Sequence, residues 1–242
     1  MINSLTIGYA GEELLERAQA LATRLHLPVD NAAKAQLLVT TDKLLLKIHP
    51  FLPLHADFSS EFWQKRRDAG KKQGLIRACK PKPGLRIIDA TAGWGRDAAI
   101  LASFGADVLM LERSPIMAAL LDDALQQRDS NSNSALKLRL VNQDAILYLN
   151  SLAAEEYPDV IYIDPMHPSR QKAALVKKDL QVLQQMIGAD EDALTLINVA
   201  RKRAIQKVVV KWPQQLPALS EPSASINGKT VRFDLYVPLS SG

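Results

Sequence analysis

The chain has 242 residues, of which 47% are hydrophobic and 23% charged, as in an ordinary globular protein. A chain of this length can bury a sizeable core without cross-links, and its single cysteine, Cys79, excludes an internal disulfide. No stretch resembles a secretion signal, and none approaches the roughly 20 apolar residues that a membrane helix needs. We therefore expect a cytoplasmic protein.

The net charge of +4 is unevenly distributed along the chain. Lysine and arginine are concentrated in three basic clusters, at 65–86, 170–178 and 201–211. Such clusters are typical of proteins that bind a phosphate backbone, although solvated helix faces give the same pattern. Three clusters around one candidate site favour a nucleic-acid partner.

The first 80 residues differ in pattern from the rest and predict a small α+β subdomain with basic helices. Apolar spacing predicts a helix over 12–25, and two apolar runs around Thr41-Asp42 predict a hairpin over 36–48. Basic helices are expected at 60–69 and 71–79. The segment Lys80-Pro-Lys-Pro-Gly84 then marks a boundary, so we expect domains at 1–80 and 81–242.

Beyond this boundary, strands and helices alternate, which predicts an α/β domain with a parallel sheet covered on both faces. We expect strands at 86–89, 107–112, 136–141, 159–164 and 207–211, helices at 96–104, 115–128, 145–154, 173–187 and 189–202, and a polar loop at 130–134. Near the end, Asn227-Gly228 predicts an antiparallel hairpin. Five parallel strands closed by such a hairpin resemble the Rossmann-like, seven-stranded sheet of class I methyltransferases. NAD-binding Rossmann domains end instead in a sixth parallel strand.

A candidate cofactor loop, Asp89-Ala-Thr-Ala-Gly-Trp-Gly-Arg-Asp97, follows the first of these strands. Gly93 and Gly95 allow a tight turn and close approach of a ligand. Glu112, 19 positions after Gly93, ends the next strand, where its carboxylate can accept both ribose hydroxyls of an adenosine. Asp144 follows the third strand, within reach of the adenine amino group.

The same glycines also fit a dinucleotide fingerprint. A pyrophosphate suits N–H groups rather than the carboxylates of Asp89 and Asp97, which suit the ammonium and sulfonium of a methionine moiety. This favours S-adenosylmethionine as the cofactor.

A candidate catalytic segment, Asp164-Pro-Met-His-Pro168, follows the fourth strand. It is similar to the [DNS]-P-P-[YFW] signature of methyltransferases that act on exocyclic amino groups of bases. The Asp164 side chain and the Pro165 carbonyl can accept the two N–H bonds of such an amine, and His167 occupies the position of the ring that stacks on the base. Most of the catalysis would then be positioning, with no metal required.

The chain resembles the ribosomal RNA small subunit methyltransferase J family over about residues 57–236. The resemblance is carried by Asp89–Asp97 and Tyr162-Ile-Asp-Pro-Met166, together with Met110-Leu-Glu-Arg113, Ala118-Ala-Leu-Leu-Asp-Asp123, Lys172-Ala-Ala-Leu-Val-Lys-Lys178, Lys207-Val-Val-Val-Lys211 and Arg232-Phe-Asp-Leu-Tyr236. The resemblance implies methylation of the N2 amino group of one guanine in 16S rRNA, with 16S rRNA or the small ribosomal subunit as the partner. It also implies cofactor contacts at Arg96, Asp97, Glu112, Arg113, Asp144, Ala145 and Asp164. The chain departs from the family pattern at His167, at the Asp144-Ala145 pair and in the segment 66–74.

Three alternative functions remain from the sequence. One is an NAD(P)-dependent oxidoreductase that uses the same glycine loop. A second is a methyltransferase that acts on another nucleic-acid amino group, and a third is an RNA-binding protein without catalytic activity. The sequence makes no prediction of the oligomeric state.

Overall fold

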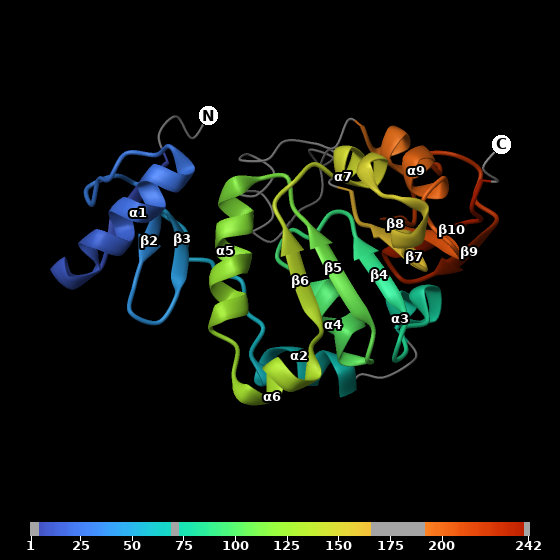
Figure 1. The fold of residues 1–242 in the computed structure, drawn as a ribbon, viewed down its shortest axis with the longest axis horizontal. Helices are drawn as coiled ribbons and strands as arrows, with labels where there is room; N and C mark the ends of the chain where they lie inside the picture. The colour runs from blue at the N-terminus through green and yellow to red at the C-terminus, as the bar shows by residue number, and fades with distance from the viewer. Residues whose placement is uncertain (1–4, 69–72, 166–191, 240–242) are drawn as a thin grey trace.

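The computed structural model describes residues 5–68, 73–165 and 192–239, which contain two β-sheets (Figure 1). The larger sheet has seven strands in the order β6-β5-β4-β7-β8-β10-β9. Its strands are β4 (Arg86–Asp89), β5 (Asp107–Leu111), β6 (Leu138–Val141), β7 (Val160–Ile163), β8 (Lys207–Pro213), β9 (Ala224–Asn227) and β10 (Val231–Tyr236). The first five are parallel, whereas β10 is antiparallel to β8 and β9 to β10. The predicted parallel sheet with an antiparallel hairpin is confirmed.

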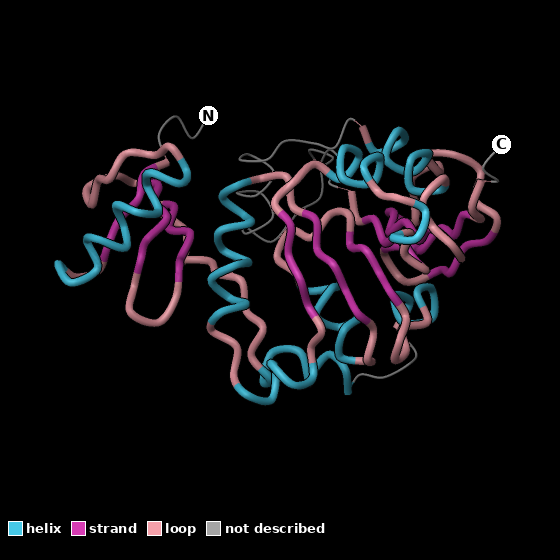
Figure 2. The backbone as a smooth tube through the Cα atoms, viewed as in Figure 1, coloured by secondary structure: helices cyan, strands magenta, loops and turns pink. Residues whose placement is uncertain are grey.

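Helices cover both faces of this sheet, as Figure 2 shows. One face packs on α3 (Gly74–Cys79), α4 (Arg96–Ser103) and α5 (Pro115–Gln126). The other packs on α7 (Ala145–Ser151) and α9 (Ala193–Arg201). Successive residues of a strand point to opposite faces, so Tyr162 belongs to the first core and its neighbours Ile161 and Ile163 to the second.

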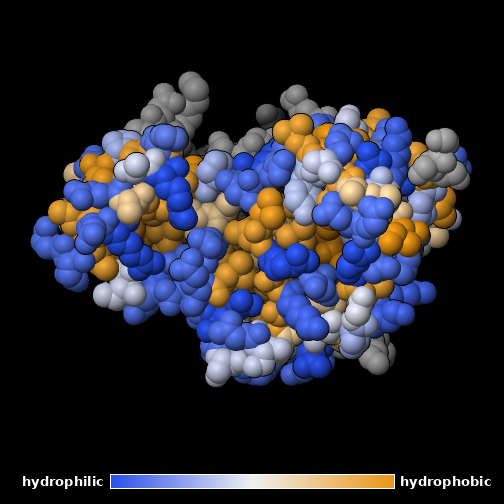
Figure 3. Space-filling view, viewed as in Figure 1, coloured by the Kyte–Doolittle hydropathy of each residue, from blue (hydrophilic) through white to orange (hydrophobic). Residues whose placement is uncertain are grey.

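Carboxyl ends of parallel strands meet at one edge of the sheet. The residues that follow β4, β5 and β7 therefore lie close together. In Figure 3, hydrophobic residues gather in the middle of the visible face, with hydrophilic residues around them.

The smaller sheet, of β1 (Thr6–Tyr9), β2 (Ala35–Val39) and β3 (Leu44–Ile48), carries α1 (Leu15–Leu25). The predicted hairpin is confirmed as β2 and β3, and the predicted first helix as α1 with a preceding 3-10 turn at Glu12–Leu14. The sequence did not predict β1, which is only four residues long and pairs with β2 in parallel.

The helices α2 (Ser60–Asp68) and α3 lie close to the larger sheet rather than to the smaller one. α2 contacts α4, and α3 contacts β9 and β10. Whether residues 1–80 fold as a unit of their own stays a prediction.

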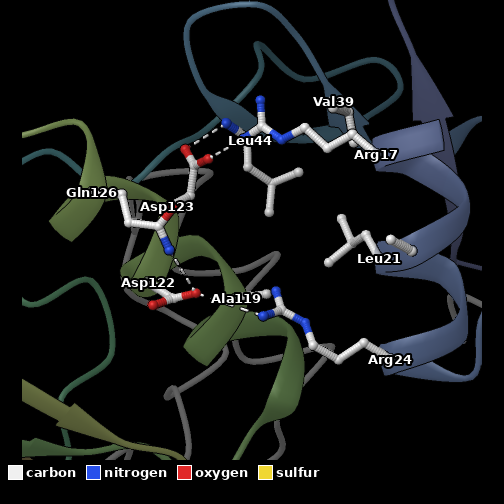
Figure 4. Close-up of a pocket in the computed structure, with 10 residues that line it drawn as sticks. Arg17, Leu21, Arg24, Val39, Leu44, Ala119, Asp122, Asp123 and Gln126 are labelled. Carbon is white, nitrogen blue, oxygen red and sulfur yellow. Dashed lines mark hydrogen bonds and ion pairs between the residues drawn. The ribbon is translucent and has the colours of Figure 1, made fainter. Parts of the chain in front are cut away.

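The smaller sheet and α1 are joined to α5 by a buried carboxylate (Figure 4). Asp123 accepts the Leu44 N–H and pairs with Arg17 of α1, both at 2.7 Å. Arg24 of α1 lies 3.6 Å from Asp122, and these side chains line a pocket of about 270 Å³.

The prediction of a loop at 130–134 is wrong, because residues Ser130–Ala135 form the helix α6. Asp129 caps it by accepting the Ser132 N–H at 2.8 Å, and the Ser132 hydroxyl accepts the buried Trp63 indole N–H at 2.9 Å. A capping aspartate and a tertiary contact outweigh the low helix propensity of serine and asparagine here. The expected helix at 173–187 lies outside the described residues.

Candidate functional site

The loop between β4 and α4 turns through two glycines in the left-handed region, Gly93 with φ 53° and Gly95 with φ 69°. A Cβ at Gly95 would lie 2.5 Å from Cζ of Phe58. At Gly93 it would meet only the Thr91 carbonyl oxygen, at 3.9 Å. Packing therefore requires glycine at 95, whereas the open space at Gly93 lets a ligand approach the backbone.

Glu112 follows β5 and lies against this loop. Its carboxylate accepts the Gly93 N–H at 3.0 Å and the Ser114 N–H at 2.8 Å, one on each oxygen. The side chain of Asn142, which follows β6, donates to the Glu112 carbonyl at 2.6 Å. Each carboxylate oxygen has two lone pairs, so the backbone contacts orient Glu112 and leave it capacity to accept ligand hydroxyls.

A network of charged side chains surrounds Asp97, the first-turn carboxylate of α4. Arg66 of α2 lies 3.0 Å from its Oδ1, and the Tyr162 hydroxyl donates to its Oδ2 at 2.7 Å. Lys211 of β8 lies 3.1 Å from the same Oδ2. Lys211 also lies 2.6 Å from Oδ2 of Asp164, so it bridges the glycine loop and the residues after β7.

Asp97 and Asp89, the two acidic ends of the loop, differ in their electrostatic environment. Burial opposes the charge on Asp97, but Lys211 and Arg66 outweigh it and lower the pKa of Asp97 to about 2. Burial raises the pKa of Asp89 to about 8. The Thr91 N–H lowers this pKa in part, whereas the neighbouring Asp97 and Asp164 carboxylates raise it further. At neutral pH, Asp97 is therefore ionised, while Asp89 is largely protonated.

Asp164 and Pro165 lie at the same edge as the glycine loop. The Asp164 N–H donates to the Thr91 hydroxyl at 2.6 Å, which fixes the exit of β7 beside the exit of β4. Pro165 is buried, whereas the Asp164 side chain is 38% exposed. His167 lies outside the described residues.

The other predicted cofactor residues are more scattered. Asp144 caps α7 by accepting the Leu147 N–H at 3.0 Å, and Ala145 is buried behind it. Arg113 lies 3.5 Å from Asp192, just before α9. The Arg96 guanidinium lies over the Phe62 ring of α2, 5.9 Å from its centre. The structure thus brings together Asp89, Asp97, Glu112 and Asp164 around the loop; the cofactor contacts themselves stay predictions.

Sequence reasoning did not place Lys211, Arg66 or Tyr162 in the site. Lys211 and Arg66 were assigned to basic clusters, although both contact Asp97. Strand register is the signal that could have found Lys211. Ile163 pairs with Val210 across β7 and β8, so the next two residues, Asp164 and Lys211, lie side by side.

Other cations of the third basic cluster also make internal contacts. Lys207 Nζ donates to the Ala78 carbonyl at 2.7 Å, and Arg203 donates to the Leu149 carbonyl at 3.0 Å. The second cluster lies outside the described residues. Exposed cations remain in the first and third clusters, such as Lys65, Arg77 and Lys202.

This set of residues fits S-adenosylmethionine. The open space at Gly93 can take a ligand against the backbone, and the ionised Asp97 carboxylate lies at the same loop. The expectation that Asp89 offers a negative charge to the cofactor is not met, because its carboxyl is buried and largely protonated at neutral pH. Among the described residues, no group of histidine, cysteine, aspartate and glutamate is arranged to hold a metal ion. Within the same parts of the chain, no helix has the length and apolar character of a membrane span.

Comparison with known proteins identifies the family of the chain. A family model described as "Putative SAM-dependent methyltransferase" matches residues 20–238. The chain is 58% identical to ribosomal RNA small subunit methyltransferase J of Legionella pneumophila (strain Lens), over 96% of each chain. It is 39% identical to the protein of that name from Coxiella burnetii (strain Dugway), over 98% of each chain.

Among solved structures, a SAM-dependent methyltransferase from Neisseria gonorrhoeae matches 98% of each chain with a TM-score of 0.74 and 26% identity. These matches favour the methyltransferase interpretation over the NAD(P)-dependent oxidoreductase that the glycine loop alone left open. The chain belongs to the ribosomal RNA small subunit methyltransferase J family.

Proposed function

We propose that the protein transfers a methyl group from S-adenosylmethionine to the N2 amino group of one guanine in 16S rRNA. The observation that carries this proposal is the position of Asp164, an acceptor for an amine, directly beside the glycine loop. Lys211 contacts Asp164 and Asp97 at 2.6 and 3.1 Å, and the Asp164 N–H donates to Thr91 within the loop. An amine held by Asp164 would therefore lie next to a ligand held by the loop.

The chemistry of an aromatic amine explains the need for Asp164 and Pro165. The lone pair of guanine N2 is delocalised into the ring, which makes the amine a poor nucleophile. When the Asp164 carboxylate and the Pro165 carbonyl accept its two N–H bonds, the lone pair is oriented towards the methyl donor. S-adenosylmethionine, when bound, would supply that methyl group on a sulfonium and would be left as a neutral thioether, while one N–H proton of the amine would pass to solvent. The protein's contribution is mainly to position and orient the amine.

The remaining roles follow from the placement of each side chain. Glu112, oriented by two backbone N–H groups, accepts the ribose hydroxyls, and Asp144 accepts the adenine amino group. Asp89, Gly93, Gly95 and Asp97 form the loop against the methionine end. Arg96, Arg113 and Ala145 border the cofactor, and His167 stacks on the base. The guanine leaves its base stack to enter such a site.

Transfer of a labelled methyl group tests this proposal. Purified protein is incubated with tritium-labelled S-adenosylmethionine and either naked 16S rRNA or small subunits that lack the modification. We expect label in N2-methylguanosine, and a loss of about 10²–10³-fold in kcat for Asp164→Ala.

Asp42→Ala is the matched control, because Asp42 is an exposed carboxylate in the turn between β2 and β3. It should retain full activity. Label in a different nucleoside, or undiminished transfer by Asp164→Ala, would contradict the proposal.

A further inference from the structure

Lys211 occupies a position that the proposed reaction does not yet explain. It lies on β8, and its side chain is 27% exposed. Its Nζ contacts two carboxylates that belong to different parts of the site, Asp97 of α4 and Asp164 after β7. No other pair of ionised groups in the described residues joins the glycine loop to the predicted catalytic segment.

Opposite charges alternate around Lys211. Asp97 and Asp164 are opposed by Lys211 and Arg66, while the Tyr162 hydroxyl donates the remaining hydrogen bond to Asp97. Removing such ions from water is costly, and a partly buried ion pair is weak evidence for stability alone. These contacts instead hold the Asp164 carboxylate in a fixed position.

We propose that Lys211 is a positioning residue for methyl transfer, which holds the Asp164 carboxylate where it accepts a hydrogen of the substrate amine. This inference rests on the function proposed above. The Asp164 side chain is 38% exposed and follows the last residue of β7, so the strand alone does not fix its orientation. The Lys211 ammonium fixes one carboxylate oxygen from the side, because β8 runs parallel to β7 in register.

Lys211 does not act as a base for the proton that the amine loses. Burial opposes its charge, but the Asp97 and Asp164 carboxylates outweigh burial and raise the pKa of Lys211 above its ordinary value. It is therefore protonated throughout the neutral range and has no lone pair to offer. Its effect on the reaction passes through Asp164.

The test compares Lys211→Met and Lys211→Arg with Lys207→Met. Lys207 is a matched control because it lies on the same strand, projects to the same face and donates to a carbonyl, that of Ala78, instead of a carboxylate. Three quantities are measured: kcat with saturating RNA and cofactor, Kd for S-adenosylhomocysteine by calorimetry, and the Asp164 rotamer in crystal structures of the ligand-free variants.

We expect kcat of Lys211→Met to fall about 10- to 100-fold, because a small displacement of a positioning group has an effect of this size. Kd for S-adenosylhomocysteine should stay within about threefold, because the substitution changes how the amine is held and not how the cofactor is bound. Asp164 should leave its original rotamer or occupy several. Lys211→Arg should recover part of kcat, because its charge is kept but its planar geometry differs. Lys207→Met should leave kcat unchanged.

Unchanged kcat in folded Lys211→Met, or an Asp164 rotamer identical to that of the unmodified protein, would overturn the proposal. If Lys211→Met does not fold, Lys211→Gln is measured in the same way, because the amide keeps most of the volume and one donor group. A failure of the proposed function is recognised separately, as an absence of methyl transfer by the unmodified protein. In that case the crystal structures still decide whether Lys211 positions Asp164.

Discussion

At one end of the site, Asp97 and Asp164 contact cationic side chains, whereas at the other end Glu112 accepts two backbone N–H groups. Side-chain cations offset the negative charge of a partly buried carboxylate, so it stays ionised. These cations come from distant elements, here α2 and β8. Backbone N–H groups orient a carboxylate through the loop itself. The comparison suggests that the first end depends on tertiary structure and the second on the local turn.

The largest effect is expected from Asp97→Asn, which removes the carboxylate shared by Arg66 and Lys211. The substitution leaves Arg66 without its carboxylate and Lys211 with Asp164 alone. Because this network is only partly buried, we expect a loss at the lower end of the range for buried ion pairs, about 3–4 kcal/mol in the free energy of unfolding. Urea unfolding measures it, with Asp42→Asn as the control. A loss below about 1 kcal/mol, the size of an ordinary surface substitution, would show that this end does not depend on the network.

The two glycines lie in the loop between the two ends of the site. We expect substitution of Gly95 to lower mainly stability, and substitution of Gly93 to weaken mainly ligand binding. Gly95→Ala should cost about 3 kcal/mol of stability, because the left-handed backbone is strained and the Cβ would meet Phe58. Gly93→Ala should cost about 1 kcal/mol, the backbone strain alone, yet weaken binding of S-adenosylhomocysteine. Thermal unfolding and calorimetry measure the two effects. Equal stability losses, or unchanged binding in Gly93→Ala, would contradict the assignment.

Glu112→Gln tests the other end of the site. The amide keeps one oxygen acceptor but loses the charge, and hydrogen bonds to a charged group contribute about 2 kcal/mol. We expect Kd for S-adenosylhomocysteine to rise about 30-fold, with a smaller change in kcat. Calorimetry gives Kd directly. If kcat falls more than affinity, Glu112 acts in the reaction rather than in cofactor binding.

Taken per pH unit, the smallest effect concerns the pH dependence of stability. Asp89 keeps its proton up to about pH 8 when folded, whereas its ordinary pKa is 3.8. Between these values the folded state binds more protons than the unfolded state, so the Asp89 contribution to stability falls as pH rises, by at most about 1.4 kcal/mol per pH unit. Asp97 behaves in the opposite way, since its lowered pKa makes its contribution fall only as pH drops from about 4 towards 2.

Asp89→Asn should flatten the dependence between about pH 4 and pH 8, measured as the free energy of unfolding in urea at several pH values. An identical slope in the variant and the unmodified protein would show that Asp89 titrates normally in the folded protein.

Most of the fold could be predicted from the sequence, because strand–helix alternation and Asn227-Gly228 are local signals. The sequence also placed Asp89, Glu112 and Asp164 at one edge, since each directly follows a strand. It could not show that Lys211 reaches Asp97, or that Arg66 of α2 does, because both contacts depend on how separate elements pack. α6 was missed for the same reason, as its Ser132 is held by the distant Trp63.

The central claim, guanine-N2 methylation of 16S rRNA, is tested most directly by mass spectrometry of nucleosides from 16S rRNA. Cells that lack the gene are compared with cells that carry the unmodified gene or the Asp164→Ala variant. We predict that one N2-methylguanosine is absent without the gene, returns with the unmodified protein and stays absent with Asp164→Ala. An unchanged set of modified guanosines in cells that lack the gene would contradict the claim.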